Sequence, residues 1–336
     1  MSTNKLKRLA GLVMSAVIIA FCAINASGCN KSESSSSDAT QPSSSVAAES
    51  TKDEAAVSAL EQLGIDAASL GIEPDIMYDT EHEVGFQLDT PEDDDTIAVL
   101  QTSMGDIAMR FFPEQAPKTV TNFLKLAENG SYNGTVFHRV IKDFIVQGGH
   151  CGTDTNQPNG VSSYGSEFED EFCDKLFNIR GAVSMATTES DTNGSQFFIN
   201  QTSAEDFLNS GGFEKLEQNW QNAKTQLLNY KDSDLMSAFI KENGDKCYNT
   251  DIVSDEVKKL YETYGGNPYL DGAYNAVDRG QTVFAQVIDG MDVVDKIASV
   301  EVDENNLPKT NVVIKSVKIT TYAEYSKAQT TASSAQ

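Results

Sequence analysis

The chain carries the stretch FHRVIKDFIVQGG at residues 137–149, and the interpretation of the whole sequence depends on it. One cation, Arg139, lies in an otherwise apolar, alternating run that is typical of a strand. Phe144 and Ile145 follow, and a glycine pair ends the stretch. The stretch therefore predicts a strand and a neighbour that place one guanidinium beside aromatic and aliphatic side chains.

Two later stretches repeat the combination of a turn with apolar side chains. Residues 193–199 (NGSQFFI) contain a turn, one amide and a pair of aromatics, and residues 269–272 (YLDG) contain an aromatic and a leucine. Together the three stretches can line an apolar groove that holds one fixed guanidinium. A single arginine in a strand is ordinarily solvated or ion-paired, so the set of motifs, rather than Arg139 alone, indicates a site.

These strings, in this order, resemble the cyclophilins, the peptidyl-prolyl cis-trans isomerases that are sensitive to cyclosporin. The resemblance covers about residues 96–200 and 269–320. Several separated motifs carry it: FHR at 137–139, Phe144, QGG at 147–149, FED at 168–170, GSQFF at 194–198 and LDG at 270–272.

The resemblance implies a mainly β fold, a closed eight-stranded antiparallel barrel with two capping helices. Short strands with few helices favour such a barrel independently. Strands are expected at 182–186, 196–200 and 312–320, and around a turn at 103–106. The two helices are expected at 117–129, where Pro117 opens an apolar stripe that ends before Gly130, and at 290–299.

The expected chemistry is rotation about an X-Pro peptide bond, whose barrier of roughly 18–20 kcal/mol comes from amide resonance. A guanidinium beside the prolyl nitrogen can donate to the lone pair that localises there as the bond twists, and apolar side chains can hold the proline ring. The resemblance assigns catalytic roles to Arg139, Phe144 and Gln147. It assigns substrate contacts to Ile145, Met185, Ala186, Thr187, Gln196, Phe197, Tyr269 and Leu270.

The sequence departs from the family pattern at three of these places and at His150. Ile145 stands where methionine is common, Thr187 where asparagine is common, and Tyr269 where eukaryotic members have tryptophan. His150 follows the double glycine where an acid is usual. These departures keep a second hypothesis open, a binding module or chaperone that holds proline-containing segments without turnover. No Ser or Cys lies in a recognisable motif with a His, which argues against a hydrolase.

Residues 1–28 resemble a bacterial lipoprotein signal peptide, and Cys29 is its expected lipidation site. Lys5, Lys7 and Arg8 precede an uncharged apolar run, and Ala26-Ser27-Gly28-Cys29 resembles a lipobox. An ordinary signal peptide or a membrane anchor is the alternative. Lipid chains on Cys29, palmitate among them, would anchor the protein outside the cytoplasmic membrane.

The remaining chain divides by composition. Residues 29–51 are Ser-rich and predict a flexible tether. Residues 52–95 are expected to form an acidic, partly helical linker. Residues 323–336 are expected to form a C-terminal tail. Residues 96–322 are the expected globular domain. Within it, 201–268 is longer than the family pattern needs and has helical stretches at 204–230, 232–243 and 254–264. This helical insertion either restricts or recruits protein substrates, or is an inert elaboration.

Charge, cysteine and histidine content narrow the partners. The net charge is −25, and removal of residues 1–28 takes away three bases and no acid. Such an acidic chain argues against nucleic acid as a partner, because its phosphates would be repelled. The resemblance implies proline-containing polypeptides as partners. The protein is expected to be a monomer. Outside the signal and Cys29 there are Cys151, Cys173 and Cys247, for which one disulfide or free thiols are both open. Neither a metal nor a cofactor is predicted, because the three histidines lack zinc-site spacing.

Overall fold

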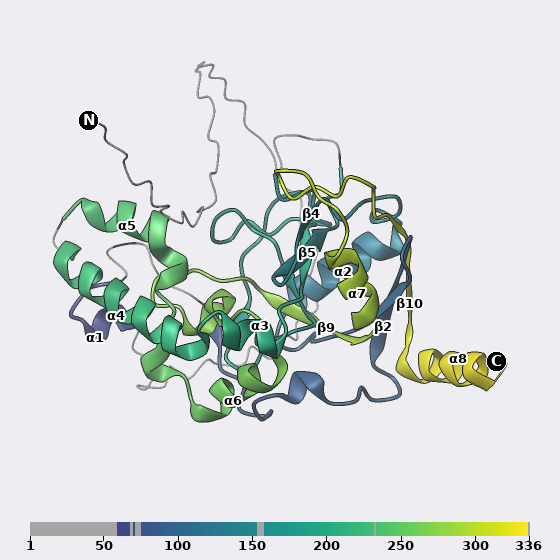
Figure 1. The fold of residues 1–336 in the computed structure, drawn as a ribbon, viewed down its shortest axis with the longest axis horizontal. Coiled ribbons are helices and arrows are strands. Elements are labelled where there is room, and N and C mark those ends of the chain that lie inside the picture. The colour runs from purple at the N-terminus through teal and green to yellow at the C-terminus, as the bar shows by residue number, and fades with distance from the viewer. Residues whose placement is uncertain (1–58, 68–69, 71–74, 153–157, 232, 335–336) are drawn as a thin grey trace, which may run out of the picture. The chain divides into compact units, whose positions relative to one another are not determined.

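A computed structural model describes residues 59–67, 70, 75–152, 158–231 and 233–334. Its main feature is one eight-stranded sheet with the strand order β10-β2-β3-β9-β7-β8-β5-β4 (Figure 1). Every pair of neighbouring strands in this sheet is antiparallel. The strands are β2 (Thr96–Thr102), β3 (Asp106–Phe111), β4 (Arg139–Ile141), β5 (Ile145–Gly148), β7 (Ala182–Met185), β8 (Phe197–Asn200), β9 (Val283–Asp289) and β10 (Ile314–Thr321). The predicted mainly β, cyclophilin-like sheet is therefore present.

The sheet is curled but is not the closed barrel that the sequence predicted. The outermost strands β4 and β10 are not paired with each other as strands among the described residues. Only the segment before β4 reaches β10, through an isolated antiparallel bridge between Val136 and Val313 and the hydrogen bond from Phe137 N to Val312 O at 2.9 Å. Strand β4 is three residues long, which leaves too little backbone for a continuous ladder with β10.

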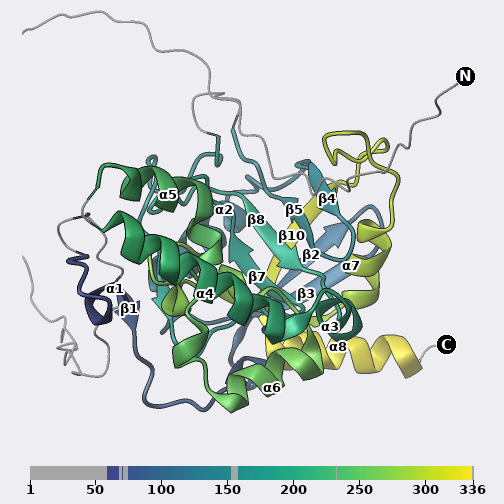
Figure 2. The ribbon, with the colours of Figure 1, turned by 60° about the vertical axis from the view of Figure 1, so that its left-hand side comes forward.

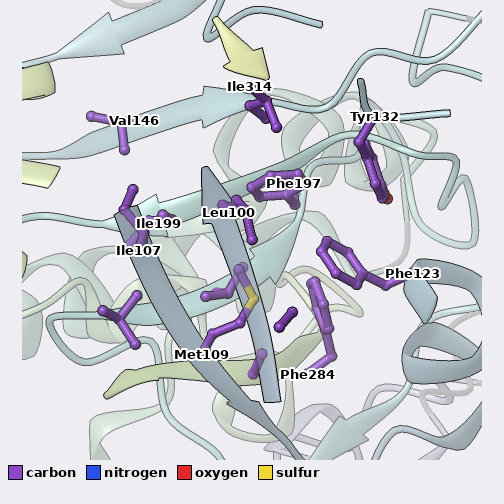
Figure 3. Packing of buried hydrophobic residues seen from close by; sticks show 14 of the residues in the cluster. Leu100, Ile107, Met109, Phe123, Tyr132, Val146, Phe197, Ile199, Phe284 and Ile314 are labelled. Carbon is purple, nitrogen blue, oxygen red and sulfur yellow. The ribbon is translucent and has the colours of Figure 1, made fainter. Parts of the chain in front are cut away.

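Helices α2 (Pro117–Glu128) and α7 (Met291–Ala298) contribute apolar side chains to the core enclosed by the sheet. Figure 3 shows Phe123 of α2 beside Phe284 of β9, with Leu100 and Met109 of β2 and β3 nearby. Pro117 begins α2, as predicted, because the first turn of a helix needs no N–H at that position. The turn between β2 and β3 contains Gly105, where a Cβ would lie 2.7 Å from the Val293 side chain. A glycine there lets α7 approach the sheet closely.

The described residues of 201–268 contain four α-helices that lie together beside the sheet (Figures 1 and 2). They are α3 (Ala204–Asn209), α4 (Gly212–Tyr230), α5 (Leu235–Asn243) and α6 (Asp255–Tyr264). The first predicted helical stretch is thus broken at Gly211, whose φ of +107° is left-handed. Ser203 and Ser254 cap α3 and α6 by accepting hydrogen bonds from backbone N–H groups three residues later.

A second core joins these helices to the sheet. It contains Phe207 and Phe213 of α3 and α4, Val257, Leu260 and Tyr261 of α6, and Ile179, Ala182 and Val283 near β7 and β9. Tyr248, between α5 and α6, is also buried in it. A third cluster, around Trp220 of α4, joins α4 and α5 to α1 (Ala59–Gln62).

Two segments outside the expected domain are structured. Strand β1 (Ile76–Met77) pairs in parallel with β6 (Phe172–Cys173), and the fully buried Gln87, in the 3-10 helix η3 (Phe86–Leu88), donates to Phe177 O and to Gln286 Oε1. Residues 75–95, which the sequence assigned to the linker, therefore pack on the domain. Most of the predicted C-terminal tail lies in α8 (Tyr322–Ser334), and Tyr322 and Tyr325 pack near Ile97 of β2.

The predicted signal peptide, tether and Cys29 lie outside the described residues. Among the helices that the structure describes, none combines the length and the hydrophobicity needed to cross a bilayer.

Candidate active site

The register of β4, β5 and β8 decides which predicted site residues share a face. Arg139 lies opposite Gln147, and Gln147 lies opposite Phe198. Residues directly opposite each other in antiparallel strands point to the same side, and successive residues alternate. Arg139, Gln147 and Phe198 therefore share one face, on which Ile145 also lies.

Phe197 points to the other face, into the interior. Its ring contacts those of Phe123, Tyr132 and Phe137, with centroids 5.6, 5.7 and 6.4 Å away, and it is 1% exposed (Figure 3). Met185, which lies opposite Phe197, belongs to the same interior cluster. The structure does not bring these two predicted residues to the face of Arg139.

Phe198 occupies the place that the sequence assigned to Phe197. It packs with Ile145 and Ala186, and the half-buried Phe144 and Leu270 contact this group. We call these five residues the apolar cluster. Gly149 makes room for the inward-pointing ring of Phe197, because a Cβ at Gly149 would lie 2.6 Å from that ring. Phe197 and Phe198 are adjacent and of the same type, so only the strand register shows which ring shares the face of Arg139. The sequence pattern therefore could not identify Phe198.

A directed chain of hydrogen bonds begins at Arg139. Arg139 Nη1 donates to Gln147 Oε1 over 3.1 Å, and Gln147 Nε2 donates to Gln196 Oε1 over 2.8 Å. Gln196 Nε2 then donates to Pro158 O and to His150 Nδ1, over 2.6 and 2.8 Å. A guanidinium can only donate, so each amide in turn must present its oxygen towards Arg139 and its nitrogen away from it.

The same polarity fixes the tautomer of His138. Its Nε2 lies 3.0 Å from Gln196 Oε1, which can only accept, so Nε2 carries the proton. Its Nδ1 is buried and makes no hydrogen bond of good geometry among the described residues, although the Val136 backbone acts to raise the pKa of the ring. Burial lowers the pKa of His138 below the usual histidine value, which favours the neutral ring. His138 thus supports the amide of Gln196 next to the site.

The remaining predicted residues form the rim. Tyr269 stacks on Phe144, with centroids 6.4 Å apart and the ring planes inclined by 18°. The backbone N–H of Ala186 donates to Gln196 O over 3.0 Å, and that of Thr187 donates to Gln281 Oε1 over 3.2 Å. Of the predicted site residues, the structure thus gathers all but Met185 and Phe197 around one face.

Burial lowers the pKa of Arg139, but arginine starts so high that the side chain stays charged at physiological pH. A half-buried cation next to an apolar cluster can bind a carbonyl oxygen or donate to a nitrogen lone pair, and it cannot act as a base. The arrangement suits a reaction that needs polarisation without a nucleophile.

Other chemistry has little support at this site. Cys151, Cys173 and Cys247 are buried free thiols, and burial raises the pKa of Cys151 to about 11 and of the other two to about 12. Within the described ranges, no three His, Cys, Asp or Glu side chains are grouped to hold a metal ion. A groove of about 390 Å³ lies between β9 and α8, remote in the sheet order from β4 and β5.

Comparison with known proteins agrees with these observations. The family model described as "Cyclophilin type peptidyl-prolyl cis-trans isomerase/CLD" matches residues 97–217 and 262–319. A protein of Staphylococcus aureus (strain USA300), named "Putative peptidyl-prolyl cis-trans isomerase", is 37% identical over 221 residues, which are 66% of this chain and 90% of that protein. A protein of the same name from Staphylococcus epidermidis (strain ATCC 12228) is 36% identical over 228 residues, 68% of this chain and 93% of the relative.

A longer relative is similar in the same region. The "Putative bifunctional phosphatase/peptidyl-prolyl cis-trans isomerase" of Streptococcus pyogenes serotype M6 is 37% identical over 235 residues, which are 69% of this chain and only 40% of that protein. Among solved structures, a cyclophilin-type isomerase of Cryptosporidium parvum aligns with a TM-score of 0.43 and 24% identity, covering 68% of this chain and 98% of its own. The family model and the curated relatives show that the chain belongs to the cyclophilin-type peptidyl-prolyl cis-trans isomerases, which indicates isomerase activity.

Proposed function

We propose that this isomerase accelerates the rotation of X-Pro bonds in exported proteins, from a position outside the cytoplasmic membrane. The observation that carries the catalytic part is the placement of Arg139 and Gln147 on the same face as Phe198, with Phe144, Ile145 and Leu270 adjoining. The apolar cluster binds the proline ring, and Arg139 faces the imide bond.

Catalysis then needs only that Arg139 binds the twisted bond better than the planar one. As the bond rotates, the prolyl nitrogen becomes pyramidal and its lone pair localises, and a guanidinium N–H can donate to it. Gln147 accepts from Nη1 and limits the rotation of the guanidinium, so less entropy is lost on binding. Each tenfold of rate corresponds to about 1.4 kcal/mol gained only in the transition state.

An exchange assay on an Ala-Pro tetrapeptide, followed by NMR or by a coupled protease, tests this proposal. Arg139→Ala is expected to lower kcat/KM roughly 10- to 100-fold, the loss of one charge-assisted hydrogen bond in the transition state. Lys142→Ala is the matched control, because Lys142 is an exposed cation in the same hairpin. Peptide binding without acceleration by the wild type would instead favour the non-catalytic binding module.

The membrane location rests on the sequence of residues 1–29. Charged residues before an uncharged apolar run, followed by Ala26-Ser27-Gly28-Cys29, support lipid attachment at Cys29. Cys29→Ser is expected to move the protein from the membrane fraction into the soluble extracytoplasmic fraction of the cells that produce it. Retention of the variant in the membrane fraction would overturn the lipid anchor.

We also infer that residues 201–268 are an insertion into the family fold. The family model leaves 218–261 unmatched between its two matching parts, which supports this inference. The helices of this segment share the second core with residues near β7 and β9. Such packing favours a role at the site over an inert surface elaboration.

A further inference from the structure

A buried carboxylate lies directly beside two of the substrate-contact residues. Asp271 follows Tyr269 and Leu270 in the chain and is 2% exposed. Its Oδ1 accepts from the backbone N and the Nδ2 of Asn178, over 2.7 and 3.1 Å. Its Oδ2 accepts from the hydroxyl of Tyr261 over 2.6 Å. Among the described residues, no other donor to Oδ2 is found.

Tyr261 and Asn178 belong to different parts of the chain. Tyr261 is a fully buried residue of α6, in the segment that the family model leaves unmatched, whereas Asn178 lies in the matched part, before β7. Asp271 thus accepts one set of hydrogen bonds from the family fold and one from the helical segment. Removing the Tyr261 hydroxyl would leave half of a buried carboxylate without a donor, which is costly.

The short backbone turn at 268–271 transmits the position of Asp271 to its neighbours. Leu270 N donates to Asn267 O and Asp271 N donates to Pro268 O, over 3.0 and 2.9 Å, so the segment forms the 3-10 turn η6 (Pro268–Leu270). Gln281 N donates to Leu270 O over 2.8 Å. A displacement of Asp271 therefore moves Leu270, which packs on the apolar cluster.

An apolar contact acts in parallel with this hydrogen bond. Tyr269 packs against the second core, to which Tyr261, Val257 and Leu260 of α6 belong, and on its other side stacks on Phe144. Tyr269 therefore lies between the core that the helical segment helps to form and the substrate side. Its place is defined by the helices as well as by the sheet.

We propose that Tyr261 is a positioning residue, through whose hydrogen bond to Asp271 the helical segment fixes the wall that Tyr269 and Leu270 contribute to the substrate site. This inference rests on the proposed function, since it assigns those two residues to the substrate. It gives the helical segment a definite role. The helices set the width of the proline-binding face and leave the chain from Arg139 to His150 untouched.

Kinetics of the full chain carrying Tyr261→Phe test the inference. Removal of the hydroxyl is expected to raise KM for the Ala-Pro peptide about three- to tenfold and to leave kcat within about twofold, because the Arg139 chain is unchanged. Tyr264→Phe is the matched control, since Tyr264 lies on the same helix with 46% of its surface exposed. An unchanged KM in Tyr261→Phe would overturn the inference.

The methyl resonances of Leu270 provide a readout that does not depend on activity. In methyl-labelled protein they are expected to shift in Tyr261→Phe and to stay in place in Tyr264→Phe. If the wild type showed no isomerase activity, the proposed function would fail while this shift still tested the coupling. If the wild type were active and the Leu270 resonances did not move, the coupling alone would fail.

A second variant keeps the test decisive if Tyr261→Phe does not fold, which loss of the native Trp220 fluorescence would reveal. Asp271→Leu keeps a side chain branched at Cγ but removes the oxygen that accepts from the Tyr261 hydroxyl. The same rise in KM and shift of Leu270 are expected. A folded Asp271→Leu protein with wild-type KM and resonances would contradict the proposal.

Discussion

Gln196 donates from Nε2 to Nδ1 of His150 over 2.8 Å, and this bond ends the chain that starts at the Arg139 guanidinium. Because each amide in the chain donates away from Arg139, the last group must accept. His150 can accept only while Nδ1 carries no proton. The residue that departs from the family pattern after the double glycine therefore helps to hold Gln196.

Replacement of His150 should reveal this link. His150→Phe keeps an aromatic ring and removes the acceptor, so one Gln196 N–H loses a partner and Gln147 is held less firmly. We expect kcat/KM on the Ala-Pro peptide to fall about three- to tenfold. His150→Asn, which can present an oxygen to Gln196, serves as the rescue variant. Equal activity of the two variants would argue against the chain.

The two neighbouring phenylalanines should give opposite phenotypes. Phe197→Ala removes a ring from the interior and is expected to lower the free energy of unfolding by about 3–5 kcal/mol, measured by denaturant titration. Phe198→Ala removes a ring from the apolar cluster and should mainly raise KM in the exchange assay. A fully active Phe198→Ala protein would exclude that ring from the proline site.

Replacement of Arg139 by lysine should not restore catalysis. The ammonium keeps the charge, but it lacks the planar fork that donates to Gln147 and to the substrate at the same time. We expect Arg139→Lys to retain no more than about a tenth of the wild-type kcat/KM, with circular dichroism unchanged. Near-normal activity of this variant would show that charge alone suffices.

The stability of the protein should depend on the protonation of Asp271. Burial raises the pKa of this carboxyl to about 7, although the hydrogen bonds from Tyr261 and Asn178 act in the opposite direction. Tyr248 and Tyr274 are the other titratable groups that interact with it, and neither carries a positive charge. The native state therefore binds more protons than the unfolded chain between about pH 4 and pH 7.

The free energy of unfolding therefore falls as the pH rises over this range. The contribution of Asp271 is fully present below the unfolded pKa of about 3.9 and is lost as the pH rises through about 7. Denaturant titrations of the wild type and of Asp271→Asn at pH 4.5 and pH 8 measure the contribution of Asp271 to the free energy of unfolding. The wild type should lose roughly 2–4 kcal/mol more than the variant over that interval. Parallel pH profiles would show that the carboxyl titrates normally.

Much of the site could be predicted from local sequence. The FHR and QGG motifs located the strands that carry Arg139 and Gln147, the GSQFF motif located the strand that follows Gln196, and Pro117 marked the start of α2. These features depend on residue type and on short spacing, which the chain itself displays. The packing of 75–95, in contrast, could not be predicted, and the acidic composition of this segment indicated a linker. The buried hydrogen bonds of Gln87 are with residues 90 and 199 positions away, and local sequence does not show such contacts.

The amino-acid sequence by itself determined the family, the cation and the apolar residue types of the site, since these are written in contiguous motifs. Only the tertiary structure decided that Phe198 rather than Phe197 lies on the face of Arg139, because strand parity has meaning only once β8 is paired with β5. The hydrogen bond from Tyr261 to Asp271 also follows only from the tertiary structure. The chain has to reverse after α6 for the turn that contains Asp271 to lie against that helix.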